Sequence, residues 1–220
     1  MNDVFKKMHW QDLGNMPYGE AWALQEDLRM KRIEGNIFDH MLLVEHPPVI
    51  TLGRRECEDD VISPDTVLSS ERIDVVKTNR GGRATYHGPG QLVGYFICEL
   101  ASFGMGIKDF VRSIEEMCIL TLMDFGITGC RDDKHPGLWI GKNKIVAIGL
   151  NVSHGVTQHG FALNVNCNLN AYKHIVACGI NDRGVTSMAS LRGTILDMDE
   201  VKQRVIVHAG QILLRKMFSI

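Results

Sequence analysis

One stretch constrains the fold of this chain more than any other: residues 80–91, with the sequence RGGRATYHGPGQ. Four glycines and a proline interrupt its polar residues just before an apolar segment. Because glycine permits conformations and close approaches that other residues forbid, the stretch predicts a loop between two strands. A tight surface connection would also explain the glycines. The density of arginine, hydroxyl, imidazole and amide groups favours a binding loop instead.

Apolar periodicity predicts a helix over residues 18–34, which Gly35 can end. Short β-branched and apolar runs predict strands on both sides of the glycine loop, at residues 41–44, 49–52, 73–77 and 92–98. Residues 54–70 are polar and are expected to form a connection. The loop is therefore expected to lie between strands.

The second half of the chain predicts two further helices, over residues 107–125 and about 199–217. Between them, a β-hairpin is predicted from strands 138–140 and 144–152, followed by a polar connection over 153–158 and a strand over 160–165. Neighbouring strands joined by short turns favour an α+β fold, with a mixed, largely antiparallel sheet covered by helices. With no repeat or linker, residues 1–220 are expected to form one domain.

Composition excludes several functional classes. A formal net charge of -2 and a pI near 6.5 argue against a general nucleic-acid binder. No apolar run approaches the ~20 residues that span a bilayer, and no apolar core of a signal peptide follows Lys6 and Lys7. The six cysteines show no CxxC spacing. We expect reduced thiols in a cytoplasmic protein that binds neither membrane nor nucleic acid.

Of the six cysteines, Cys178 is the one that we expect to be exposed to a cleft, because it adjoins Gly179 in a segment without helical or strand periodicity. A thiol becomes a useful nucleophile beside a cation or a base, and Lys144, at the start of an apolar strand, is a candidate partner. His154, His159 and Cys167 match no zinc spacing. Phosphate-loop, Rossmann and nucleophile-elbow motifs are absent from the sequence, so neither a metal nor another cofactor is expected.

Five blocks, in this order, resemble the lipoyl(octanoyl) transferase family: residues 42–54, 80–91, 136–145, 159–166 and 177–180. The similarity extends over about residues 10–195. It implies the fold of lipoate and biotin protein ligases. It also implies transfer of an octanoyl group from acyl carrier protein to a lysine of a lipoyl domain, without ATP. The expected acceptors are the lipoyl domains of 2-oxoacid dehydrogenases and the H protein of glycine cleavage.

The resemblance also assigns residues to roles. Cys178 is similar to the nucleophile that carries the acyl group as a thioester, and Lys144 to the residue that tunes its protonation. The acyl-binding residues implied by the matching blocks are Arg80, Gly81, Gly82, Arg83, Ala84, Thr85, Tyr86, His87, Ala147, Ile148, Gly149, Gly160, Phe161 and Ala162. Two positions depart from the family pattern: Ala177 stands where proline is common, and Arg83 where glutamine is common.

Other functions compete with this interpretation. One is an amidotransferase that moves octanoyl or lipoyl groups between lipoyl-bearing proteins, although its cysteine is expected in a different block. Another is a ligase that activates free lipoate with ATP, but adenylate chemistry needs no cysteine nucleophile. A non-catalytic protein that binds acyl carrier protein is the third alternative, and it predicts binding without a covalent adduct.

Overall fold

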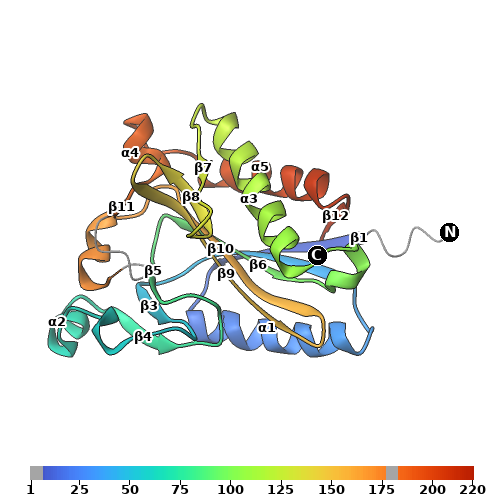
Figure 1. The fold of residues 1–220 in the computed structure, drawn as a ribbon, viewed down its shortest axis with the longest axis horizontal. Coiled ribbons are helices and arrows are strands. Elements are labelled where there is room, and N and C mark those ends of the chain that lie inside the picture. Colours follow the sequence, from blue (N-terminus) through green and yellow to red (C-terminus); the bar gives the residue numbers. More distant parts are fainter. Residues whose placement is uncertain (1–6, 177–182) are drawn as a thin grey trace.

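The structure, a computed structural model, describes residues 7–176 and 183–220 (Figure 1). Its larger sheet follows the order β12-β1-β2-β6-β10-β9-β8-β7, and a short strand, β11, also pairs with β9. The bounds are β1 Lys7–Asn15, β2 Asp39–Glu45, β6 Gln91–Ile97, β7 Cys130–Arg131, β8 Gly137–Ile140, β9 Asn143–Ser153, β10 Val156–Asn164, β11 Gly184–Val185 and β12 Lys216–Ser219. β1 pairs in parallel with β12 and β2, whereas the path from β2 to β7 is antiparallel. The expected mixed, largely antiparallel sheet is confirmed.

A smaller sheet has the order β4-β3-β5, where β4 is Asp74–Lys77, β3 is Val49–Leu52 and β5 is Ala84–His87. β3 is parallel to β4 and antiparallel to β5. The strand β5 corrects one expectation, because the middle of the glycine-rich stretch is itself paired and does not form a loop throughout. The stretch therefore combines a loop over residues 80–83, the strand β5 and a turn over residues 88–90 that leads into β6.

Helices cover both faces of the larger sheet (Figure 1). α1, Tyr18–Ile33, packs on one face, and α3, Ile107–Asp124, and α5, Met198–Ile212, pack on the other. Strand β2 shows why both faces are apolar: Leu42 and Val44 belong to the core under α1, while Met41 and Leu43 belong to the core under α3 and α5. Burial on both sides makes β2 a continuous apolar run rather than an alternating one.

The remaining helical segments are short. They are η2 Glu58–Asp60, α2 Asp65–Ser70, η3 Leu100–Phe103, η4 Leu169–His174 and α4 Met188–Arg192. Both η2 and α2 lie in the stretch expected to be a polar connection, so that expectation is wrong in part. Likewise, residues 156–158 belong to β10 rather than to a polar connection. None of the described helices combines the length and the apolar composition needed to cross a bilayer.

The C-terminal helix is shorter than its apolar pattern predicts. α5 ends at Ile212, Leu214 adopts a positive φ of 50°, and the chain then turns into β12 instead of continuing as helix to residue 217. β12 pairs with β1, a strand that the sequence pattern did not predict. The two ends of the described chain therefore meet at one edge of the larger sheet.

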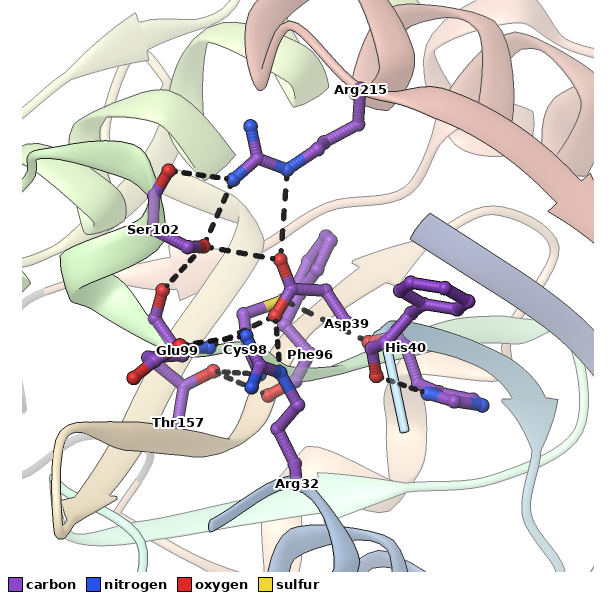
Figure 2. A network of polar contacts seen from close by, with 10 residues as sticks. Arg32, Asp39, His40, Phe96, Cys98, Glu99, Ser102, Thr157 and Arg215 are labelled. Atoms are coloured by element: carbon purple, nitrogen blue, oxygen red, sulfur yellow. Dashed lines mark hydrogen bonds and ion pairs between the residues drawn. The ribbon is translucent and has the colours of Figure 1, made fainter. Parts of the chain in front are cut away.

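A buried ionic network ties this end to the rest of the fold (Figure 2). Asp39, at the start of β2, accepts a 2.9 Å hydrogen bond from Nε of Arg32 and pairs with Nε of Arg215 at 3.6 Å. Arg32 also pairs with Glu99, and Arg215 donates to the carbonyl and hydroxyl of Ser102, each at 2.9 Å. The network joins α1, β2, η3 and the segment before β12, which explains why the chain turns after α5.

Candidate active site

A cavity of about 430 Å³ lies between the glycine loop and the β9/β10 hairpin. The structure brings almost all of the predicted acyl-binding residues to its walls. They are Arg80, Gly81, Gly82, Arg83, Ala84, Thr85, His87, Ala147, Ile148, Gly149, Gly160, Phe161 and Ala162. Residues of the glycine-rich stretch and of the two strands of the β9/β10 hairpin thus form the walls of one cavity.

The register of the β9/β10 hairpin explains this convergence. Gly149 pairs with Gly160, Ile148 with Phe161, and Ala147 with Ala162. Since cross-strand partners lie side by side, each residue of one block is brought directly beside its counterpart in the other.

Close backbone contact fixes the glycine loop onto β9. The amide of Gly81 donates to the carbonyl of Leu150 at 3.0 Å. A Cβ atom placed on Gly149 would lie 2.8 Å from the carbonyl oxygen of Gly81, which is closer than such atoms pack. Glycine at position 149 is therefore required for the cavity wall to close at this point.

Arg80 holds the loop against β3. Its guanidinium donates to the carbonyl of Thr51 at 2.5 Å and to the hydroxyl of the same residue at 2.8 Å. The side chain is buried, so its charge is held by fixed protein dipoles rather than by bulk water. Arg80 thereby both lines the cavity and orders its wall.

Tyr86 is the one predicted acyl-binding residue that does not line this cavity. Its neighbours in β5, Thr85 and His87, line it, and successive side chains of a strand point to opposite faces. The ring of Tyr86 packs edge-on against Tyr172 at 5.7 Å, within the core of the smaller sheet. Its place in the sequence block therefore reflects packing behind the wall.

Lys144 is the second residue of β9 and lines the cavity, and it is only 7% exposed. Its ammonium donates to the carbonyl of Pro136 at 3.3 Å and lies 4.7 Å from the centroid of the Trp139 ring. The β8/β9 hairpin predicted from the sequence is confirmed, and it places this amine at the cavity wall.

Cys178 lies outside the described residues, so its predicted pairing with Lys144 stays a prediction. Backbone hydrogen bonds fix the chain on either side of residues 177–182. Before them, the amide of Val176 donates to the carbonyl of Asp60 at 2.9 Å; after them, the amide of Thr186 donates to the carbonyl of Lys144 at 2.9 Å. Val185 also pairs with Lys144 in β11, so the chain rejoins the sheet beside this lysine.

A cluster of buried aromatic polar groups behind the glycine loop was not predicted from the sequence. Nε2 of His46 lies 2.7 Å from the hydroxyl of Tyr95, His87 stacks on Tyr18 at 5.9 Å, and Nδ1 of His159 lies 3.5 Å from the Tyr18 hydroxyl. These residues come from five separate segments, so no local sequence pattern predicts the cluster.

Burial keeps the imidazoles of this cluster neutral. It lowers the pKa of His46 to about 4, and burial together with the nearby Arg80 charge lowers the pKa of His159 to about 3. Burial also lowers the pKa of His87 well below its usual value. His87 and His159 line the cavity, so at neutral pH they present polar but uncharged surfaces to a ligand.

The family model of the lipoyl protein ligase A/B catalytic domain matches residues 17–210 of this chain. The chain belongs to this family. The match spans all the elements that line the cavity, from α1 to the β9/β10 hairpin, and it extends through most of α5. The resemblance inferred from the five sequence blocks is confirmed.

Members of the family with similar sequences are octanoyltransferases. The chain is 42% identical over 207 residues to the octanoyltransferase of Desulforamulus reducens, covering 94% of this chain and 91% of the relative. It is 46% identical over 202 residues to that of Caldicellulosiruptor bescii, covering 91% of this chain and 89% of the relative. Similarity at this level extends over nearly the whole of each protein.

A solved structure shows the same fold at much lower sequence identity. The putative lipoate protein ligase of T. acidophilum, solved with bound lipoic acid, has a TM-score of 0.77 at 18% identity, covering 97% of this chain and 89% of that protein. This likeness confirms the expected lipoate-ligase-like fold.

Among the described residues of our chain, no group of three or more His, Cys, Asp and Glu side chains is arranged to hold a metal ion.

Proposed function

We propose that this protein is an octanoyltransferase that moves an octanoyl group from acyl carrier protein to a lysine of a lipoyl domain, through a thioester on Cys178. The observation that carries the proposal is the placement of Lys144 in the wall of the cavity, beside the point where the chain returns from the Cys178 segment. The octanoyltransferases named above, at 42–46% identity, support the same reaction.

The cavity has the volume and the apolar walls to hold an acyl chain. Its volume of about 430 Å³ falls within the roughly 300–1,000 Å³ of typical small-molecule sites. Ala147, Ile148, Phe161 and Ala162 supply apolar walls, and burial keeps the imidazoles of His87 and His159 uncharged. An eight-carbon chain would bury its apolar surface there and gain free energy from leaving water.

The reaction balances without ATP. The Cys178 thiolate attacks the carbonyl carbon of the donor thioester, a new C–S bond forms, and the bond to the phosphopantetheine sulfur breaks. The amine of the acceptor lysine then attacks the same carbon, forming an amide and releasing the Cys178 thiol. In this scheme Lys144 accepts the thiol proton, returns one to the departing thiol, and later helps to deprotonate the amine.

The proposal extends to the rest of the chain. The pairing of β1 with β12 supports our inference that residues 1–220 act as one catalytic domain, because the two ends share one sheet. We also infer that the enzyme works in the cytoplasm, and the five described cysteines are free thiols, as a reducing compartment would keep them. As acceptors we propose the lipoyl domains of 2-oxoacid dehydrogenases and the H protein of glycine cleavage.

The choice of acyl donor tests the proposal. The protein is incubated with a lipoyl domain and, in separate reactions, with octanoyl-acyl carrier protein, with free octanoate and ATP, or with an octanoylated lipoyl domain of different sequence, so that the donor and acceptor peptides differ in mass. The product is the octanoyl-lysine peptide measured by mass spectrometry. We expect product from the carrier-bound donor alone. Product only from octanoate and ATP would identify a ligase, and product only from the octanoylated domain would identify an amidotransferase.

The assigned role of Lys144 has its own test. Replacing it with Ala removes the amine from the cavity wall, so acylation of the enzyme at neutral pH should slow by about 10²–10⁴-fold, the usual contribution of a general acid–base group. Lys31→Ala, which changes a lysine in an exposed ion pair of α1, is the control. Equal rates for wild type and Lys144→Ala across the pH range would remove Lys144 from the mechanism.

A further inference from the structure

The carboxylate of Asp60 is fully buried at the end of η2 and is held from two sides. Nε of Arg83 donates to it at 2.9 Å, and Nη2 of the same residue lies 2.5 Å from Oδ1. The amide of Cys57 donates to Oδ2 at 2.9 Å. Because a buried charge is costly unless it is paired and hydrogen-bonded, Asp60 depends on Arg83 for its place in the fold.

The backbone of η2 and the residues that follow it hold the segment that leads to Cys178. The carbonyl of Asp60 accepts the amide hydrogen of Val176 at 2.9 Å, and Val61 forms an antiparallel bridge with Ile175. One residue earlier, the carbonyl of His174 accepts from the amide of Ile62 at 2.8 Å. Val176 precedes Cys178 by two residues in the sequence, and its amide is fixed by Asp60.

The other end of the contact is the cavity wall. Arg83 follows Gly82, whose carbonyl accepts from the amide of Arg55 at 3.1 Å. The carbonyl of Arg83 accepts from the amide of Gly53 at 3.3 Å, and Gly81 is bonded to β9 as described above. A rigid path therefore runs from β9 through the glycine loop to Arg83, then to Asp60 and Val176.

We propose that Arg83 is a positioning residue: through its ion pair with Asp60 it holds the segment before Cys178 in register with the cavity wall that carries Lys144. This inference rests on the proposed function, in which Cys178 is the nucleophile. An alternative role for the Arg83 charge would be contact with the acidic carrier protein. The guanidinium of Arg83 already pairs with the buried carboxylate of Asp60, and the Arg83 side chain is only 31% exposed.

A positioning role for Arg83 predicts that its substitution lowers kcat and leaves KM nearly unchanged. Misplacing a reacting group by about 1 Å can cost on the order of 10²-fold in rate. For Arg83→Gln and for Asp60→Asn we therefore expect kcat to fall roughly 10- to 100-fold, with the KM for octanoyl-acyl carrier protein unchanged within about twofold. The double variant, Asp60→Asn with Arg83→Gln, buries no unpaired charge and should recover activity relative to either single variant.

A second readout uses no carrier protein. Alkylation of Cys178 by iodoacetamide is followed by peptide mass spectrometry as a function of pH. If Arg83 positions the thiol segment relative to Lys144, the alkylation profile of Arg83→Gln should move to higher pH and the rate at pH 7 should fall. Lys77→Gln, which removes another cation from an exposed pair with Glu56, should leave both assays unchanged.

These results decide the inference independently of the proposed function. If wild-type protein accepts octanoyl on Cys178, and Arg83→Gln raises KM with kcat and alkylation unchanged, then Arg83 contacts the carrier and the positioning role is wrong. Unchanged kcat, KM and alkylation would also overturn it. Circular dichroism checks that each variant is folded, and where a single variant is not, the double variant and Arg83→Lys, which keeps the charge but loses the two-pronged contact, supply the comparison.

Discussion

The ammonium of Lys144 and the indole of Trp139 are cross-strand partners in the β8/β9 hairpin, with 4.7 Å between the nitrogen and the ring centroid. The guanidinium carbon of Arg183 lies 4.6 Å from the centroid of the same ring. Trp139 also donates its indole hydrogen to the carbonyl of His135 at 3.2 Å, which fixes the ring plane. One indole therefore orients the cavity lysine and the first described residue after the Cys178 segment.

This relationship predicts that Trp139→Leu slows acylation of the enzyme, because both cations lose their aromatic partner. Cation–π contacts contribute about 0.5–2 kcal/mol, so the expected loss is roughly 2- to 30-fold in the single-turnover rate. Trp139→Phe keeps a π face and should retain more of the rate. Rates that do not distinguish the leucine variant from wild type would show that Trp139 has only a packing role.

Glycine at position 160 is predicted to be needed for stability as well as for the cavity. A Cβ atom at Gly160 would lie 2.2 Å from the carbonyl oxygen of Gly94 in the neighbouring strand, so Gly160→Ala must move one of two buried backbones. Urea unfolding should show a loss of about 1–3 kcal/mol, the usual cost of overpacking.

The matched control is Gly19→Ala in the first turn of α1, where no atom lies within 4 Å of the added Cβ. Because alanine favours helix over glycine, this variant should be unchanged or more stable by up to about 1 kcal/mol. Equal stability of the two variants would contradict the close approach of β10 and β6.

Stability should fall between pH 7 and pH 5 because of the buried imidazoles. The pKa of His46 is lowered to about 4 by burial, so between its ordinary pKa near 6.5 and pH 4 the unfolded chain binds a proton that the folded chain excludes. Stability is therefore complete above pH 6.5 and is lost as the pH falls. For this one imidazole the loss from pH 7 to pH 5 is about 2 kcal/mol.

His46→Gln removes this titration while keeping a donor for the carbonyl of Met16, which His46 contacts at 2.7 Å. Denaturant unfolding at several pH values should give a shallower slope for the variant than for wild type. The same slope in both proteins would mean that His46 is not held neutral.

The network in Figure 2 is predicted to be essential for stability but not for chemistry. Asp39 is 3% exposed and pairs with both Arg32 and Arg215, and none of these residues lines the cavity. Asp39→Asn removes the carboxylate that pairs with the buried Arg215 and leaves Arg32 to pair with the partly exposed Glu99, so the free energy of unfolding should drop by about 3–5 kcal/mol.

The exposed pair of Lys31 and Asp27 provides the comparison, and Asp27→Asn should cost no more than about 0.5 kcal/mol. Below its unfolding temperature, Asp39→Asn should keep the wild-type kcat. A variant of normal stability, or one that is stable but inactive, would contradict this assignment.

The sequence was most informative where structure is local. The β8/β9 hairpin was predicted from two strands and a short turn, and the structure confirms it. The pairing of Gly149 with Gly160 was not predicted, because residues 153–158 were expected to form a polar connection although 156–158 belong to β10. The strand over residues 41–44 was likewise predicted from its apolar run, and it lies within β2. By contrast, the end of α5 could not be predicted, because Arg215 leaves the helix to reach Asp39, which is 176 positions away in the sequence.

The same limit applies to the site. His46, Tyr95 and Tyr18 carry no spacing that marks them as neighbours, and only the tertiary fold brings them together. Arg83 was placed among the acyl-binding residues, and its partner, Asp60, lay in a stretch expected to be a polar connection. Long-range charge pairing of this kind leaves no periodic signal in a sequence.

The central claim is that Cys178 carries the octanoyl group as a thioester, and intact mass measurement tests it most directly. Wild-type protein incubated with octanoyl-acyl carrier protein should gain the mass of one octanoyl group, and hydroxylamine should remove it, as expected for a thioester. Cys178→Ser should show no hydroxylamine-labile adduct. A wild-type protein without the adduct, or a Cys178→Ser variant that gains as much hydroxylamine-labile octanoyl as wild type, would contradict the account.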